Sequence, residues 1–188
     1  VPADYFELPP PQNDFYEKHG IDPANQLILS VARMVPVKDH VTLLKAFKKL
    51  VAEIDSAKLL LVGDGPLRDD LEDFAGELNI KDKVYFAGYQ YDMENWLAAA
   101  DISVLSSHVE GLPCFVVESM AAGLPVVATA VGGTLETVVE GESGFLTPPE
   151  DPDYMAEKII LLLKDTNLRK KFSKNALEKA RNDFSIES

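Results

Sequence analysis

The sequence is poor in the residues that build disulfide frameworks, membrane spans and nucleic-acid-binding surfaces. Its 188 residues include one cysteine, Cys114, so no internal disulfide can form. No apolar run approaches the roughly 18 residues of a membrane-spanning helix. Basic residues are scarce, because 18 Lys+Arg face 31 Asp+Glu and the formal net charge is -13. This charge argues against nucleic acid as a partner, and the lone cysteine leads us to expect a cytoplasmic protein.

Candidate metal ligands and targeting signals are also lacking. His19, His40 and His108 stand at no spacing typical of a metal site, and we predict none. The chain begins without methionine, signal peptide or transit peptide, so we expect a piece of a larger protein. Its apolar content of 46% is enough to fill the core of one large domain or two small ones.

Short apolar runs alternate with helical patterns along most of the chain. The predicted strands are residues 27–31, 58–62, 84–87, 102–105, 125–128 and 144–146, and the predicted helices are 41–54, 67–78, 92–100, 114–122, 135–139, 154–164 and 168–182. Strands that are apolar on both faces are typical of a parallel sheet covered on two sides. We therefore predict an α/β fold, a Rossmann-like doubly wound parallel sheet of about six strands with helices on both faces.

The two ends of the chain differ from this pattern. Five prolines fall within the first 25 residues and predict an inter-domain linker over residues 1–25. The alternating strands and helices define a domain over residues 26–166. Residues 167–188 are interpreted as the C-terminal helix of the same domain.

Two cations follow the first predicted strand, where a sheet of this kind binds its ligands. Lys45, Lys48 and Lys49 fit the solvated face of an amphipathic helix, whereas Arg33 and Lys38 fall in the preceding loop. A guanidinium and an ammonium in such a loop suit adjacent phosphoryl groups. Spacing alone leaves a phosphate site and a solvated loop equally open.

Two carboxylates follow the fourth predicted strand. Glu110 falls in a loop and Glu118 in the second turn of the helix that Pro113 begins, so the Glu118 side chain leans back toward the helix N-terminus. A helix N-terminus attracts phosphate, and an ionised carboxylate accepts hydrogen bonds from sugar hydroxyls. The pattern favours a nucleotide sugar over the acid and base pair of a glycosidase. An ordinary surface position for Glu118 stays open.

Glycine-rich loops follow two further strands. The run from Gly63 to Pro66 is a poor dinucleotide fingerprint, because Arg68 stands at the third glycine position and Asp64 would face pyrophosphate. We therefore reject NAD as a ligand. Gly65 and Gly133 either allow close approach of a ligand or serve tight turns.

Taken together, these motifs resemble a known family. They are Arg33 with Lys38, Leu61–Pro66, Glu110 and Glu118 separated by seven residues, Met120–Ala128, Val131–Gly133, Glu136 and Gly141–Leu146. From about residue 26 to 164 the chain resembles the C-terminal domain of retaining GT-B glycosyltransferases of the glycosyl transferases group 1 family. Two positions depart from the family pattern, since Ala32 and Asp39 stand where glycine is usual.

The resemblance implies the roles of the site residues. Arg33 and Lys38 would bind the diphosphate and stabilise it as leaving group, Glu110 would contact the sugar, and Glu118 would hold the ribose hydroxyls. Arg33, Lys38 and Glu110 are thus the expected catalytic residues. The remaining expected donor-binding residues, which offer backbone amides or close backbone approach, are Gly65, Gly111, Phe115, Val116 and Gly133.

The resemblance also implies the reaction and its partners. The donor would be a nucleoside diphosphate hexose, with a UDP-sugar favoured over a GDP-sugar, and no cofactor or metal would be needed because Arg and Lys replace it. The product would belong to polysaccharide or glycolipid synthesis. The acceptor site would lie on a missing N-terminal domain, which would also make any contact with the cytoplasmic membrane face. We expect this half to bind nucleotide without transferring sugar. An epimerase half and a non-catalytic binding module are the alternatives.

Overall fold

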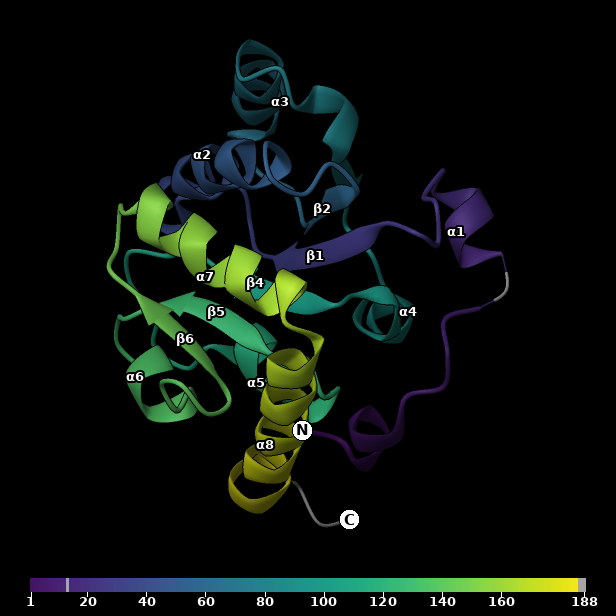
Figure 1. The fold of residues 1–188 in the computed structure, drawn as a ribbon, viewed down its shortest axis with the longest axis vertical. Coiled ribbons are helices and arrows are strands. Elements are labelled where there is room, and N and C mark those ends of the chain that lie inside the picture. Colours follow the sequence, from purple (N-terminus) through teal and green to yellow (C-terminus); the bar gives the residue numbers. More distant parts are fainter. Residues whose placement is uncertain (13, 186–188) are drawn as a thin grey trace.

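The computed structural model describes residues 1–12 and 14–185 and contains one six-stranded sheet. All strand pairs are parallel, in the order β3-β2-β1-β4-β5-β6 (Figure 1). The strands are β1 Gln26–Val31, β2 Ala57–Val62, β3 Val84–Gly88, β4 Ile102–Leu105, β5 Val126–Thr129 and β6 Gly144–Thr147. The prediction of a Rossmann-like doubly wound sheet is confirmed.

Helices connect the strands and close the chain. They are α1 Phe15–Lys18, α2 His40–Val51, α3 Arg68–Glu77, α4 Met93–Ala99, α5 Cys114–Ala121, α6 Thr134–Thr137, α7 Pro152–Lys164 and α8 Thr166–Phe184, with 3-10 turns at Ala3–Glu7, Pro36–Lys38 and Lys81–Lys83. The last two begin two residues earlier than predicted, because Asp151 and Asp165 cap them through the amides of Tyr154 and Leu168, both at 2.9 Å. None of the described helices is long and apolar enough to cross a membrane.

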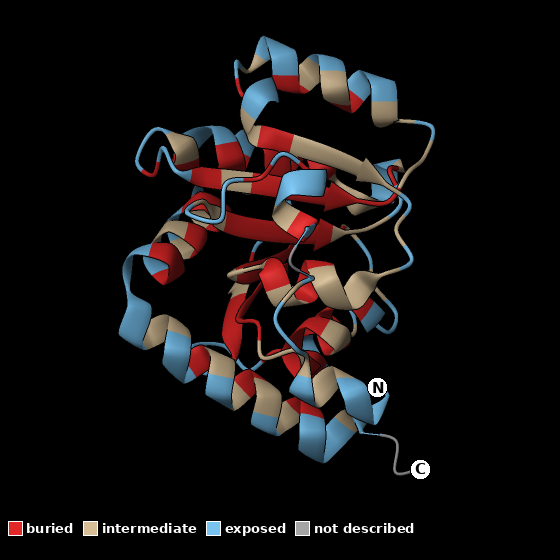
Figure 2. Ribbon diagram, turned by 90° about the vertical axis from the view of Figure 1, so that its right-hand side faces the viewer, coloured by how far each residue is buried: buried red, intermediate tan, exposed pale blue. Residues whose placement is uncertain are grey.

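In the part of the chain that the structure describes, the core consists of three clusters of buried side chains, and alternate residues of each central strand enter different clusters. Ile28 of β1 lies in the cluster beneath α2 and α7, whereas Leu27 and Leu29 lie in the cluster beneath α4. Both faces of the sheet are therefore buried, and the exposed residues lie on the outer sides of the helices and in the loops (Figure 2). This burial explains why the strands read as continuous apolar runs.

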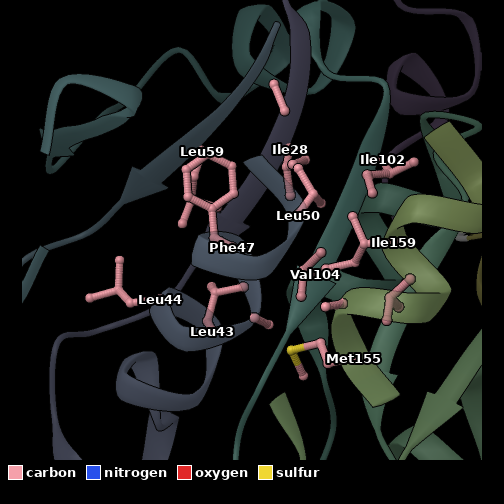
Figure 3. Close-up of a cluster of buried hydrophobic side chains, with 14 of the residues drawn as sticks. Ile28, Leu43, Leu44, Phe47, Leu50, Leu59, Ile102, Val104, Met155 and Ile159 are labelled. Carbon is pink, nitrogen blue, oxygen red and sulfur yellow. The ribbon is translucent and has the colours of Figure 1, made fainter. Parts of the chain in front are cut away.

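The largest of these clusters lies between the sheet and the pair α2 and α7, which pack side by side (Figure 1). Phe47 and Leu50 of α2 meet Ile159 of α7 over the side chains of β1, β2 and β4 (Figure 3). Helix α8 continues from α7 to α5. Phe172 of α8 belongs to the cluster beneath α2 and α7. Ala176 of α8 belongs to a third cluster, which it forms with residues of α5 such as Val116 and Met120. Residues 186–188 of the predicted C-terminal helix lie outside the described part of the chain.

The first 25 residues pack against the sheet domain. They hold a 3-10 turn and α1, and both Phe15 and Ile21 are buried in the core cluster of α4. Phe15 meets the indole of Trp96 edge to face at 5.1 Å, and the ring of His19 lies 4.7 Å from it. These aromatic side chains anchor the segment to the sheet domain. Its role as an inter-domain linker stays a prediction.

This aromatic contact predicts that the N-terminal segment contributes to the stability of the domain. Truncating the buried Phe15 leaves a cavity against Trp96, so we expect Phe15→Ala to lower the free energy of unfolding by about 3 kcal/mol. Urea unfolding measures this loss. Tyr16→Ala, one residue further on at a partly exposed position, is the control and should lose less. Equal and small losses would contradict the anchoring role.

His40, the first residue of α2, is buried, and its Nδ1 has no hydrogen-bond partner among the described residues. Burial lowers the pKa of this imidazole from 6.5 to about 4, although the neighbouring Asp39 opposes the shift. Between these two values the unfolded chain binds a proton that the folded chain does not. The contribution of His40 to the free energy of unfolding is therefore fully present above pH 6.5, and it is lost as the pH is lowered toward 4.

The sign of this shift gives a measurable pH dependence. At about 1.36 kcal/mol per pKa unit, His40 accounts for a loss of about 3 kcal/mol between pH 6.5 and pH 4. We expect His40→Gln to show a correspondingly smaller loss over this interval in urea unfolding at a series of pH values. Carboxylates that titrate in the same interval are common to both proteins and cancel in the difference. Parallel pH profiles would contradict the assignment.

Candidate functional site

The strand order places the candidate site between β1 and β4. The chain runs from β1 toward one edge of the sheet and returns to β4 to build the other, so a crevice opens where the two directions part. The loops that follow these strands carry residues 32–39 and 106–113. They bring Lys38 of the first loop next to Glu110 of the second.

Two glycines hold the first loop close to the loop after β2. A Cβ on Gly63 would lie 2.2 Å from the carbonyl oxygen of Ala32, and one on Gly65 would lie 2.5 Å from that of Met34. The amide of Met34 also donates to the carbonyl of Asp64 at 2.9 Å. The close approach at Gly65 is therefore that of the protein's own backbone, which gives Gly65 a packing role in place of the expected ligand contact.

The loop after β4 binds the first loop directly. The Ser106 hydroxyl donates to the Lys38 carbonyl at 2.9 Å, and the His108 amide donates to the Val37 carbonyl at 2.8 Å. Ser107 is buried, and its hydroxyl donates to Glu110 Oε1 at 2.6 Å. Sequence reasoning missed both serines. Their signal was their position directly after a buried strand, where side chains face the ligand crevice.

Lys38 and Glu110 form an ion pair across the crevice. Lys38 Nζ lies 2.5 Å from Glu110 Oε1, the same oxygen that accepts from Ser107. The Glu110 side chain is 9% exposed and that of Lys38 is 25% exposed, so the carboxylate is the more deeply buried partner. The structure thus joins two residues that the sequence placed in separate motifs.

The loop after β5 packs against the backbone of Glu110 and Gly111. A Cβ on Gly132 would lie 1.9 Å from the Glu110 carbonyl oxygen, and one on Gly133 would lie 1.9 Å from that of Gly111. The Gly133 amide donates to the Glu110 carbonyl at 3.1 Å. Since that amide is occupied, Gly133 positions the Glu110 loop and does not offer the expected backbone donor.

Asp39 occupies a backbone conformation that favours glycine. Its φ of 43° lies in the left-handed region, and its carboxylate caps α2 by accepting from the Thr42 amide at 3.2 Å. The other carboxylate oxygen faces His108 Nε2 at 3.7 Å. The side chain is 9% exposed, so its negative charge is turned toward the helix N-terminus and away from solvent.

Two variants distinguish the helix cap that the Asp39 side chain provides from the left-handed backbone conformation of this residue. Asp39→Ala loses the cap and strains the left-handed backbone, and we expect it to lower the free energy of unfolding by about 2 kcal/mol. Asp39→Gly loses the cap but accepts the positive φ, so a loss of about 0.5 kcal/mol is expected. Urea unfolding of both variants compares the two values. Equal losses would show that the backbone conformation contributes nothing.

The N-terminus of α5 offers donors for an anion. Among the described residues, the amides of Gly111, Leu112 and Phe115 have no backbone acceptor, whereas the Val116 amide donates to the Pro113 carbonyl at 2.9 Å. The free amides lie at the positive end of the α5 dipole, beside the Lys38 and Glu110 pair. Gly111 and Phe115 therefore keep their expected capacity to bind phosphate oxygens, and Val116 does not.

Glu118 lies in a separate cavity next to the same helix end. The cavity measures about 330 Å³, and Leu112, Cys114 and Val117 contribute to its mostly apolar lining. Burial raises the pKa of the Glu118 carboxyl, an effect that the nearby terminal ammonium of Val1 partly opposes. No contact joins Glu118 to Glu110 within the described ranges. The two carboxylates thus lie apart, and both adjoin the loop from Glu110 to Cys114.

Arg33 completes the group of predicted residues. It is exposed on the first loop and makes no ion pair with any residue that the structure describes, so its guanidinium is available to a ligand.

A larger hollow of about 900 Å³ lies outside the strand-end crevice, on the flanks of α2 and α7, where Lys49 pairs with Asp153 and Lys164 with Glu53. Those cations are already neutralised. In residues 1–12 and 14–185 no cluster of His, Cys, Asp and Glu is arranged to hold a metal ion.

Comparisons with known proteins identify the family of this chain. The chain matches the family described as Glycosyl transferases group 1 over residues 11–179. It is 34% identical over 171 residues to N-acetyl-alpha-D-glucosaminyl L-malate synthase of Bacillus anthracis, covering 91% of this chain and 45% of that protein. The fold of Anabaena Alr3699/HepE, solved in complex with UDP and glucose, matches with a TM-score of 0.88 at 26% identity, covering 98% of this chain and 51% of that one.

A second solved structure matches over its whole length. The C-terminal domain of the glycosyl transferase group 1 protein LpcC from Francisella tularensis has a TM-score of 0.83 at 23% identity, with 100% of both chains covered, and shows the shared fold. The protein therefore belongs to the glycosyl transferases group 1 family, and its sheet is the Rossmann-like domain of GT-B glycosyltransferases. The chain spans about half the length of the Bacillus and Anabaena relatives.

Proposed function

We propose that this chain is the donor-binding half of a retaining glycosyltransferase that takes a hexose from a nucleoside diphosphate sugar. The observation that carries the proposal is the grouping of Lys38, Glu110 and the free amides of α5 at the one point where the strand order reverses. An ammonium and helix amides suit a diphosphate, and a carboxylate beside them suits sugar hydroxyls. The same grouping in a chain of net charge -13 supports a small anionic ligand over a nucleic acid.

The proposal gives each of these groups a role. Arg33 and Lys38 clamp the diphosphate, and the amides of Gly111 and Phe115 bind its remaining oxygens. Glu118 accepts the ribose hydroxyls in its apolar cavity, whose walls suit the nucleoside. Glu110 accepts a hydroxyl of the transferred sugar.

Catalysis by this half is electrostatic. Negative charge develops on the diphosphate as its bond to the sugar lengthens, and the fixed cations and helix amides stabilise that charge more strongly in the transition state than in the bound donor. Arg33 and Lys38 supply the positive charge without a metal ion. The acceptor approaches from a second domain, so the isolated chain binds donor without transferring sugar.

A titration series with different nucleotide sugars would identify the base and the sugar of the donor. The Anabaena neighbour was solved with UDP and glucose, which makes a UDP-hexose the first donor to test here. A GDP-hexose is the second. The cytoplasm, where such donors are made, is the compartment that the proposal requires.

Calorimetric titration with uridine, UDP and UDP-glucose, and with the GDP and ADP series, tests the assignment. Glu118→Ala should weaken nucleoside and nucleotide alike, because both carry the ribose diol. Arg33→Ala should weaken only the diphosphates, by about 1–3 kcal/mol for a charged hydrogen bond. Lys45→Ala removes an exposed charge from the outer face of α2 and is the matched control. Equal losses for uridine and UDP in Arg33→Ala would refute the clamp.

A further inference from the structure

Glu110 depends on Lys38 for the neutralisation of its charge in the ligand-free chain. The carboxylate is 9% exposed, and it receives one ammonium and one hydroxyl, both on Oε1. A buried carboxylate that loses its cation is strongly destabilised unless new hydrogen bonds replace it. Any ligand that draws Lys38 away must therefore compensate Glu110.

A diphosphate draws Lys38 in this way. Phosphoryl oxygens carry more charge than one carboxylate, and the free amides of Gly111 and Phe115 hold them close to the ammonium. When the ammonium turns to the phosphate, Glu110 keeps the Ser107 hydroxyl and loses its cation. Hydroxyl groups of an attached sugar supply the missing donors, whereas a free nucleoside diphosphate supplies none.

We propose that the Lys38–Glu110 ion pair makes this site discriminate in favour of the intact nucleotide sugar against the free nucleoside diphosphate. The inference rests on the proposed function and deepens it. Bound sugar compensates the carboxylate that the diphosphate exposes, so the two halves of the donor bind cooperatively. Once the sugar has left, the diphosphate competes with Glu110 for Lys38, which favours release of the product.

Ser107 is a positioning residue in this scheme. Its buried hydroxyl donates to Glu110 Oε1 at 2.6 Å. In the proposed scheme this bond remains when Lys38 turns to the phosphate and keeps the carboxylate in place. The Thr129 hydroxyl in turn donates to the Ser107 carbonyl at 2.6 Å, which fixes this residue from the β5 side. Loss of the Ser107 hydroxyl should therefore affect recognition of the sugar and leave recognition of the diphosphate intact.

The test compares the affinities of UDP and UDP-glucose for the wild-type chain and Glu110→Gln by calorimetry. Gln keeps the shape of Glu and removes the competing charge, so Lys38 is free for phosphate. We expect Glu110→Gln to bind UDP at least about fivefold more tightly than wild type, and to lose the preference for UDP-glucose over UDP. Lys38→Met should weaken UDP in both backgrounds.

The serine gives a second and independent comparison. Ser107→Ala should weaken UDP-glucose about tenfold while UDP binds as in wild type, and Ser107→Thr should restore the sugar preference because it keeps the hydroxyl. Equal weakening of both ligands in Ser107→Ala would mean a merely structural role and would overturn the positioning assignment.

The ligand-free pair is measured without any nucleotide. A double-mutant cycle of Lys38→Met and Glu110→Gln in urea unfolding should show favourable coupling between the two side chains. A coupling of zero overturns the inference. If the wild-type chain binds none of the nucleotides, the proposed function fails and the inference fails with it. If wild type binds UDP and Glu110→Gln binds it no more tightly, the inference alone fails.

Discussion

The contacts between the loops that follow β1 and β4 determine how Lys38 and Glu110 are arranged. Ser106 and His108 donate to the backbone of Lys38 and Val37, so the carboxyl ends of two neighbouring strands are fixed to each other by hydrogen bonds as well as by sheet pairing. The ion pair of Lys38 with Glu110 is possible only because these loops meet. Around this junction the sheet provides rigidity, since both of its faces are buried.

The fold follows from the sequence because its signals are local and repeated. Apolar runs such as the one from Leu27 to Val31 predict buried strands, and the helical patterns between them predict a parallel sheet. Two features lacked such signals. The helix ends set by Asp151 and Asp165 depend on polar caps outside the apolar pattern, and the burial of Phe15 depends on Trp96, 81 positions further along the sequence.

Prediction of the site had a different limit. Residue types and strand order placed Lys38 and Glu110 at the same edge of the sheet, but their pairing is a contact over 72 positions that no spacing rule contains. The glycines show the same limit, because their neighbours in the fold are also distant in the sequence. Gly65 and Gly133 were expected either to allow close approach of a ligand or to serve tight turns, and in the structure the backbone that approaches each of them belongs to the protein. Whether a glycine faces a ligand or another loop is decided by tertiary packing.

The contact of Gly132 and Gly133 with the Glu110 loop joins two main chains without any side chain between them. Such a contact is indifferent to what the neighbouring positions carry, so Val131 and Leu135 can change in size or polarity while the Glu110 carbonyl keeps its place. The loop after β5 can therefore vary without disturbing the backbone that carries the carboxylate. The exposed Leu135, two residues after Gly133, is one position with room for such variation.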